Sequence, residues 1–527
     1  MSAPDGAPTE HVSVAIVGGG PTGITAATLL AQHGVDTLVL DRWPQVYPQP
    51  RAVHLDDEVY RILARLGIAE EFAAISRPAR GLRLVDRDLK VLAEFRRDTP
   101  VTQNGFPAAS MFDQPELEEL LRRNLARFPR ARFRGDVEVL GVTASAAVGP
   151  LHLRIRDRMT NLESVISADY VLGCDGANST VRGAIGASMR NLKFDQRWLV
   201  VDITTTADLQ QWDGVHQVCD GQRAGTYMRI GPTRYRWEFA LLDHESADDY
   251  TTLAALRPLI APWTRHVADA DLRVMRAAEY TFRAQIADRW RRGNVFLLGD
   301  AAHLTPPFIG QGMGAGLRDA MNLAWKIAAV HRRSLAPSVL DSYEAERRPH
   351  ARVMIALALY VGRAMTFGGR LGAVARAVVL PRVHKVPGLR AKVIDSQTPP
   401  LRSSTLVQRT LATRRITGRL CPNPFLDTDY RLDDVLGSGF GVITTVELSP
   451  PQQDIVAARG ARTVHAAAGS ELARWLNRHH VKAAVLRPDR TVMIAGRNLT
   501  ALCRAVPLFL VDQASDPSPH TAPAHYE

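Results

Sequence analysis

Three short segments carry residue types and spacings that could bind a phosphorylated cofactor. The first reads Gly18-x-Gly20-x-x-Gly23 and is followed by Asp41. Gly18 would allow a tight turn, Gly20 would let backbone N–H groups approach a pyrophosphate, and Gly23 would let a helix and a strand pack closely. A following helix N-terminus favours phosphate charge, and Asp41 could accept hydrogen bonds from adenosine ribose hydroxyls. This segment therefore predicts a dinucleotide site, but alone it does not distinguish NAD from FAD.

The other two segments each place an acid next to a glycine, as Asp175-Gly176 and Gly299-Asp300. Both follow short apolar runs of the kind that form buried strands. Ligands bind at the carboxyl ends of the strands in a doubly wound sheet, so Asp175 and Asp300 are expected in the crevice formed by the first segment. The sequence thus predicts that three separated segments share one ligand.

Hydrophobic periodicity indicates the elements that must position these segments. Residues 12–17 and 37–40 are strand-like, and residues 24–33 form a helical stretch, which together predict a β-α-β unit. A long helix is expected at residues 317–330, and the apolar stretch 353–362 is interpreted as a buried helix. The architecture is therefore expected to be α/β with a doubly wound sheet.

The pattern changes in the middle of the chain. From about residue 198 to 281, short apolar runs alternate with turn residues, which is typical of a mostly antiparallel sheet. Strand and helix patterns of the earlier type resume near residue 295. The middle sheet is therefore predicted to be an insertion that could cover the site.

Composition restricts the class of protein. The chain has 527 residues, several times the roughly 150 of one domain, so two or three domains are expected. Lys and Arg number 65 against 54 Asp and Glu, a net charge of +11. The basic residues are scattered rather than gathered with aromatics, which favours small anions over nucleic acid as partners.

Cysteine usage and hydropathy indicate a protein of the cytoplasm that does not enter a membrane. The four cysteines lie far apart without a CxxC spacing, so neither a metal site nor a disulfide framework is expected. The N-terminus lacks the basic and apolar regions of a signal peptide. The longest later apolar stretch has about ten residues, whereas a membrane span needs about twenty.

The three segments together resemble the class A flavoprotein aromatic hydroxylases, whose pattern is GxGxxG, a central DG motif and a late GD motif. The resemblance implies FAD as the bound cofactor, with Asp300 at the ribitol and Asp175 and Gly176 beside the pyrophosphate groove. Arg51 and Gln114 also match flavin-contacting positions. Outside that family, they could be a surface arginine and an ordinary helix N-terminal residue.

A glycine-rich stretch at residues 310–316 precedes the long helix. Free N–H groups near Gly312, Met313 and Gly314 would face an anion, such as the negatively charged pyrimidine edge of a reduced flavin. A flexible glycine loop is the alternative. No second nucleotide fingerprint is present, because the glycines at 437–441 have the wrong spacing. The family resembled likewise lacks a separate nicotinamide domain.

Within the family, the sequence is most similar to the 3-(3-hydroxyphenyl)propionate/3-hydroxycinnamate hydroxylases, through residues 50–58, 198–203, 310–326 and 346–348. This resemblance implies reduction of FAD by NAD(P)H, with NADH favoured, then addition of O2 at flavin carbon C4a. One oxygen would go to the carbon ortho to the hydroxyl of a small phenolic substrate. The alternatives are a tailoring hydroxylase of a polyketide or other polycyclic phenol, and an FAD-fold binding protein without turnover. A monomer and a homodimer are both compatible with the sequence.

The C-terminal region resembles the thioredoxin-like tail of these hydroxylases but lacks its redox CxxC, so Cys421 is expected to serve packing or dimer contacts. The predicted organisation is an FAD-binding domain at 1–195 and 286–365, a substrate-binding sheet insertion at 196–285, a helical linker region at 366–425, a thioredoxin-like domain at 426–514 and a disordered tail at 515–527.

Candidate residues for the substrate follow from the phenol chemistry. His54 is the candidate base because its ordinary pKa lies near working pH and it follows Arg51 in the chain. Tyr227 and Tyr235 in the predicted sheet could hydrogen-bond the phenol oxygen, although strand aromatics are more often packed. A substrate carboxylate would suit a forked donor such as Arg234 or Arg236, which strand alternation places on one face.

Overall fold

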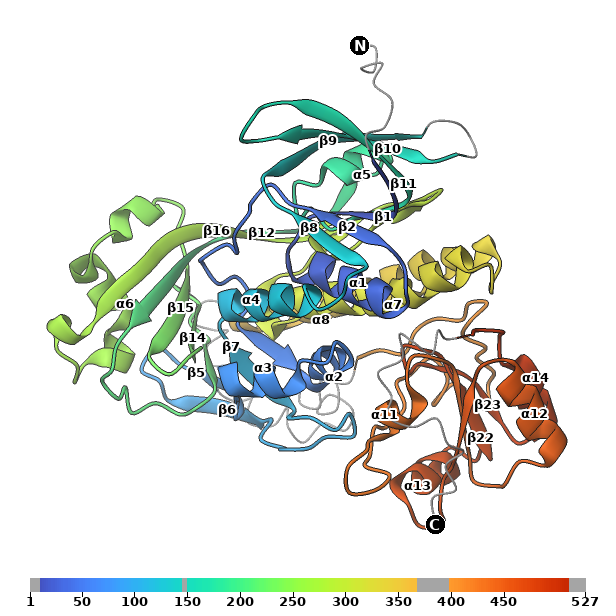
Figure 1. Ribbon diagram of the computed structural model, residues 1–527. Coiled ribbons are helices and arrows are strands. Elements are labelled where there is room, and N and C mark those ends of the chain that lie inside the picture. Colours follow the sequence, from blue (N-terminus) through green and yellow to red (C-terminus); the bar gives the residue numbers. More distant parts are fainter. Residues whose placement is uncertain (1–9, 145–148, 367–397, 511–527) are drawn as a thin grey trace.

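A parallel sheet carries the three glycine-rich segments at one edge. The computed structural model describes residues 10–144, 149–366 and 398–510. The parallel strands lie in the order β18 (Val295–Leu297), β11 (Glu163–Gly173), β1 (Glu10–Val17), β2 (Thr37–Leu40) and β8 (Ala131–Arg134) (Figure 1). The order reverses direction between β1 and β11, and in a doubly wound sheet the ligand crevice lies at this reversal. Antiparallel strands extend this sheet: β9 (Val137–Ala144), β10 (Leu151–Asp157) and β17 (Arg291–Arg292).

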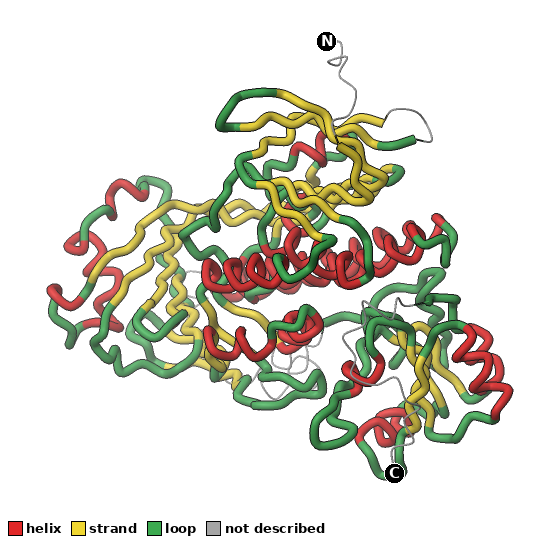
Figure 2. The backbone as a smooth tube through the Cα atoms, viewed as in Figure 1, coloured by secondary structure: helices red, strands yellow, loops and turns green. Residues whose placement is uncertain are grey.

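Helices pack below this sheet, in the middle of the molecule (Figures 1 and 2). They are α1 (Pro21–Gln32), α4 (Gln114–Leu125), α7 (Gly312–His331) and α8 (Asp341–Thr366). The helices predicted at residues 24–33 and 317–330 are confirmed, but both begin earlier, at Pro21 and Gly312. The helix expected at 353–362 is found as part of α8, but only one side of it is buried, because Val353 is 49% and Tyr360 61% exposed. No helix in the described ranges is long and apolar enough to span a membrane.

A second, largely antiparallel sheet forms the other wall of the molecule. Its order is β19 (His303–Leu304), β16 (Arg273–Ala287), β12 (Met189–Thr204), β15 (Arg234–Ala240), β14 (Gly225–Arg229), β13 (Val215–Val218), β5 (Gly81–Val85) and β6 (Val91–Arg96). Strands β5 and β6 come from before the predicted insertion, and β5 pairs in parallel with β13. Helix α6 (Leu253–Thr264) covers one face of this sheet through Leu256, Ile260 and Trp263.

A small third sheet has three strands. It consists of β3 (His54–Asp56), β7 (Ala109–Phe112) and β4 (Ser76–Pro78), with helices α2 (Asp57–Arg65) and α3 (Ala69–Ile75) beside it. The Asp56 carboxylate accepts a hydrogen bond from the N–H of Val59 (3.0 Å) and so caps α2. A short helix, α5 (Thr180–Ala184), follows β11 and is similarly capped by Ser179.

The C-terminal unit has its own four-stranded sheet, in the order β21 (Arg462–His465), β20 (Gly441–Thr444), β22 (Ala483–Leu486) and β23 (Val492–Gly496). Its helices are α11 (Leu432–Leu436), α12 (Pro450–Ala458), α13 (Glu471–Arg478) and α14 (Leu499–Ala505). Asp433 joins this unit to α2, because it accepts hydrogen bonds from Arg61 Nε (2.6 Å) and Nη2 (2.7 Å). Residues 398–425 are turns and isolated bridges, while 367–397 and the predicted tail at 515–527 lie outside the described residues.

Candidate active site

Close backbone contacts shape the glycine-rich turn after β1. Gly18 has φ +103°, and a Cβ there would overlap the carbonyl oxygen of Cys174 at the end of β11. A Cβ on Gly23 would in turn overlap the carbonyl oxygen of Gly18. The space beside Gly20 is open, and Gly20 lines a pocket at the N-terminus of α1. The turn therefore directs helix N–H groups toward a space that suits a pyrophosphate.

Asp41 lies beside this turn, directly after β2. Its carboxylate accepts hydrogen bonds from the N–H groups of Gly19 (2.5 Å) and Trp43 (2.7 Å). A carboxylate has about four acceptor positions, so capacity remains for ribose hydroxyls. The structure therefore places Asp41 beside the Gly18–Gly23 turn, as the sequence predicts.

The central DG segment divides its roles between two residues. The Asp175 carboxylate accepts hydrogen bonds from Ser179 Oγ (2.5 Å) and the Val181 N–H (3.1 Å), which fix the turn into α5. Burial raises the pKa of the Asp175 carboxyl, and these hydrogen bonds oppose the rise. Gly176, with φ +79°, lines the pocket. Asp175 therefore shapes the loop, and the backbone around Gly176 faces the pocket.

The late GD segment presents an acid to the same pocket. Asp300 lines the pocket, and Gly299 precedes it with φ +58°. Desolvation beside the pocket raises the pKa of the Asp300 carboxyl, and the electrostatic influence of the neighbouring His303 and Arg51 side chains opposes the rise. Asp300 is exposed to the pocket, where its carboxylate could accept hydrogen bonds from hydroxyl groups of a bound ligand.

Asp319 organises this turn from below, a role that sequence analysis missed. Its side chain is fully buried and accepts hydrogen bonds from the Gly299 N–H (3.1 Å) and Arg347 Nε (2.8 Å). His303 Nε2 lies 2.8 Å from the same carboxylate. His303 is thus a structural partner of Asp319. The stretch 310–326, which contains Asp319, contributes to the family resemblance, but no local sequence pattern indicates that Asp319 is buried.

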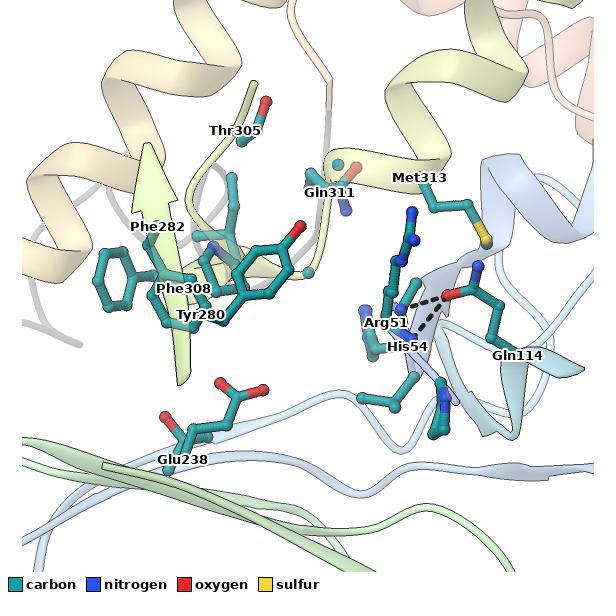
Figure 3. Close-up of a pocket in the computed structure, with 18 of the residues that line it drawn as sticks. Arg51, His54, Gln114, Glu238, Tyr280, Phe282, Thr305, Phe308, Gln311 and Met313 are labelled. Carbon is teal, nitrogen blue, oxygen red and sulfur yellow. Dashed lines mark hydrogen bonds between the residues drawn. The ribbon is translucent and has the colours of Figure 1, made fainter. Parts of the chain in front are cut away.

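Gln114 and Arg51 meet on the side of the pocket that lies across from Tyr280 and Phe282 (Figure 3). Gln114 Oε1 accepts hydrogen bonds from the N–H groups of Arg51 (3.0 Å) and Ala52 (2.5 Å). Gln114 Nε2 donates to Glu118 (2.6 Å), which fixes the orientation of the amide. Gln114 therefore holds the segment that carries Arg51 at the pocket.

The N-terminus of α7 closes another side of the pocket. Gly312 and Met313 line it, and Gly314 follows in the first helical turn. The preceding residue, Gln311, is fixed by Asp56 Oδ2, which accepts from its Nε2 (2.8 Å), and by Arg318 Nη1, which donates to its Oε1 (3.0 Å). The first N–H groups of α7 are therefore held in place beside the pocket.

The structure does not bring Tyr227 and Tyr235 to the pocket. Both are buried on the face of the second sheet that α6 covers, at 2% and 3% exposure. Their rings pack with Trp237 and Trp263, and the Tyr227 ring lies 5.6 Å from that of Trp263. This corrects the expectation that they face the substrate, since the packing of α6 decides which face of the strand is covered.

The two arginines proposed for a substrate carboxylate already have partners. Arg234 forms an ion pair with Asp113. Arg236 lines the pocket, but its guanidinium donates to Asp202 (2.7 and 2.9 Å) and to the carbonyl oxygens at 50 and 51 (2.6 and 3.1 Å). A buried guanidinium bound in this way holds the chain near Arg51. This corrects the expectation of a free forked donor at these positions.

His54 lines the pocket, with its ring against Gly310. A Cβ at position 310 would lie only 2.8 Å from His54 Nδ1, so glycine is required there. Burial, aided by the charge of Arg97, lowers the pKa of His54 to about 4. The imidazole is therefore neutral at neutral pH, which makes it a poor base but a good hydrogen-bonding group.

One pocket of about 620 Å3 is bordered by the turns at Gly20, Gly176 and Asp300, by the segment of Arg51 and His54, and by the start of α7. One end lies among the strand-end turns, and the other is floored by the second sheet, from which Glu238 projects (Figure 3). Cofactor and drug-sized sites commonly measure 300–1,000 Å3. In the described ranges, no group of three or more His, Cys, Asp or Glu is arranged to hold a metal ion. The pocket thus lies within the size range of a cofactor site and reaches from the strand-end turns to the second sheet.

Comparison with protein families and curated proteins identifies relatives of this chain. Residues 11–358 match the family model described as FAD binding domain. A "3-(3-hydroxy-phenyl)propionate/3-hydroxycinnamic acid hydroxylase" from Burkholderia cenocepacia (strain HI2424) is 34% identical, over 92% of this chain and 93% of the relative. A "Probable NADH-specific resorcinol 4-hydroxylase" from Rhodococcus jostii (strain RHA1) is 31% identical, over 99% of this chain and 98% of the relative.

Solved structures share the fold. A ternary complex of aklavinone-11 hydroxylase with FAD and aklavinone superposes with a TM-score of 0.79, covering 95% of this chain and 100% of that chain. The two sequences are 22% identical, so the likeness concerns the architecture.

Proposed function

The chain belongs to the family of FAD-dependent aromatic hydroxylases, and on this premise we propose that it inserts one oxygen atom of O2 next to the hydroxyl group of a small phenol. The observation that carries the proposal is the convergence of three strand-end turns and one sheet face on a single pocket. Such a pocket can hold a flavin and a substrate in contact, which this reaction requires.

The residues of the pocket fit FAD. The Gly18–Gly23 turn and the N-terminus of α1 would receive the pyrophosphate, and Asp41 the adenosine ribose. The late GD turn would hold the ribitol through Asp300, and the Gly176 backbone would border the pyrophosphate groove. Bound FAD, once reduced by NADH, supplies the oxygen chemistry.

Contacts to the flavin ring are proposed from both sides of the pocket. Arg51, positioned by Gln114, would approach the ring from the loop after β2. The N–H groups at Gly312, Met313 and Gly314 would stabilise negative charge on the reduced ring, because they are already oriented and need no reorganisation. His54, neutral at neutral pH, would contribute a hydrogen bond in the same region rather than remove a proton.

The proposed substrate is a phenylpropanoid phenol such as 3-(3-hydroxyphenyl)propionate, supported by the name of the relative at 34% identity. A resorcinol is the second candidate, supported by the relative that matches 99% of the chain. The name of that relative also favours NADH as the reductant. A polycyclic substrate is less favoured, because the structure solved with aklavinone is only 22% identical.

We also propose the domain roles. The parallel sheet, from 1–195 and 286–365, would hold FAD, and the second sheet, chiefly from 196–285, would hold the substrate. Residues 426–510 begin with α11 and continue in the chain order β-α-β-α-β-β-α, with β20 parallel to β21 and antiparallel to β22. This order supports a thioredoxin-like domain, for which 366–425 would serve as the linker. Cys421 is buried against residues of the C-terminal unit, which supports a packing role.

Steady-state kinetics test the proposal. Purified protein should carry a yellow flavin, and NADH consumption should rise when 3-(3-hydroxyphenyl)propionate is added, with a product one oxygen heavier. If NADH is consumed and only peroxide forms, that compound is a mimic, and resorcinol is tested next. A protein that binds flavin but oxidises NADH at one unchanging rate with either phenol would contradict the proposed hydroxylase.

A further inference from the structure

Three polar side chains form a row across the floor of the pocket. Gln217 pairs with Thr226 across β13 and β14, and Thr226 pairs with Glu238 across β14 and β15. Residues paired in this way project from the same face of a sheet. All three line the pocket, and Glu238 is only 8% exposed. The row lies on the face opposite to Tyr227 and Tyr235.

Glu238 differs from the other charged residues of this sheet face. Within the described ranges, its carboxylate has neither a hydrogen bond nor an ion pair, and it projects into the pocket near Tyr280 (Figure 3). Arg236, two positions earlier on β15, is bound to Asp202. Glu279 also lines the pocket, but Arg197 donates to it from Nε and Nη2 (both 2.7 Å). Glu238 is thus a buried carboxyl group open to a ligand.

Charged groups around Glu238 set its acidity. Burial raises the pKa of the Glu238 carboxyl, the charge of Arg236 opposes this, and Asp202 adds to the rise. Arg276, on β16, also lowers the pKa. A carboxyl with a raised pKa is a stronger base when ionised, and a buried one gains most from a ligand that donates a hydrogen bond.

We propose that Glu238 binds the hydroxyl group of the substrate phenol and accepts its proton. This inference rests on the proposed hydroxylase function. The O–H bond of the phenol breaks, the proton moves to a carboxylate oxygen of Glu238, and the electron pair stays on the phenolate oxygen. The phenolate makes the neighbouring ring carbon more nucleophilic. The proton leaves Glu238 for solvent when the product departs, so the step needs no oxidant or further reactant.

The other ionisable side chains considered as acceptors of the phenol proton are less suited than Glu238. The pKa of His54 is about 4 because of burial, so its imidazole takes up a proton only weakly. Tyr227 and Tyr235 lie on the covered face of the sheet. Asp300 borders the strand-end turns proposed for the cofactor. Of the two carboxyl groups that the second sheet presents to the pocket in the described ranges, Glu279 is bound by Arg197 and Glu238 is not.

Glu238→Gln tests the proposal, with Glu279→Gln as the matched control on the same pocket. Glu238→Gln should keep FAD but lower kcat for hydroxylation by about 100-fold or more, the usual contribution of a positioned base. Its deficit should shrink as the pH approaches about 10, where phenols ionise without help. Glu279→Gln should show neither the loss nor the pH rescue, because Arg197 occupies that carboxylate.

The outcomes separate this inference from the proposed function. If the wild type hydroxylates phenols and Glu238→Gln matches it in kcat and pH profile, the role of Glu238 is refuted and the function stands. If the wild type hydroxylates no phenol, the proposed function itself fails. Should Glu238→Gln lose its flavin, Glu238→Asp decides. A fall in kcat of about 10-fold or more in a flavin-bound protein supports the role, since a misplacement of about 1 Å is costly, and an unchanged kcat overturns it.

Discussion

Replacing Asp319 with asparagine should destabilise the protein and weaken FAD binding together. The Asp319 carboxylate accepts hydrogen bonds from Arg347 and the Gly299 N–H and contacts His303, with no exposure of its side chain. An asparagine amide would turn an N–H2 group toward one of these donors. Loss of one partner of a buried ion pair costs about 3–5 kcal/mol. For a chain of 527 residues the unfolding entropy is about 1.1 kcal/mol per K, so each kcal/mol lowers Tm by about 1 °C and the expected fall is about 3–5 °C.

Asp341→Asn provides the control, because it removes an equivalent charge from an exposed ion pair. The Asp341 side chain is 75% exposed and lies 2.5 Å from Arg291. Exposed pairs contribute about 1 kcal/mol or less. Thermal unfolding of both variants, with and without added FAD, and a fluorescence titration of FAD into flavin-free protein give the comparison. The account of the Gly299 turn is refuted if both variants melt together and bind FAD equally well.

Three other perturbations follow from the same structure. Gly20→Ala should leave the Tm of flavin-free protein unchanged, because no atom lies within 4 Å of the added Cβ. It should nevertheless weaken FAD binding in the same titration. An unaltered affinity would contradict the pyrophosphate assignment. Asp433→Asn should speed limited proteolysis between residues 398 and 430, because Arg61 and Arg490 lose a shared carboxylate. The control is Asp454→Asn, at an exposed residue. Equal cleavage rates in the two variants would argue against this docking contact. Burial lowers the pKa of His54 to about 4, so from its unfolded value of about 6.5 down to about 4 only the unfolded chain binds that proton, and stability falls with falling pH. His54→Asn should therefore lessen the loss of urea resistance across this window, and an identical pH slope would exclude His54 as its source.

Local patterns predicted the elements around the first turn well. The glycine spacing and the adjacent apolar runs lie within about thirty residues, so strand, turn and helix follow from short-range constraints. The strand predicted at residues 37–40 is found as β2, Thr37–Leu40. The early start of α7 at Gly312 went unrecognised because glycines weaken a helical pattern.

Long-range contacts decided what could not be predicted. Strand β5 joins the second sheet by pairing with β13, more than a hundred residues away, and β6 follows through its pairing with β5. No local pattern reports the long-range pairing. Alternation along β15 separates Tyr235 from Arg236, but only the packing of α6 determines which face is buried. Asp319 and Asp56 likewise acquire their roles from partners elsewhere in the chain.

Isotope labelling tests the central claim most directly. The protein is incubated with NADH, 3-(3-hydroxyphenyl)propionate and O2 labelled with heavy oxygen, and the product is analysed by mass spectrometry. The account predicts a dihydroxylated product that carries one heavy oxygen atom, with NADH consumed in equal amount. A hydroxylated product whose new oxygen comes from unlabelled water would contradict it.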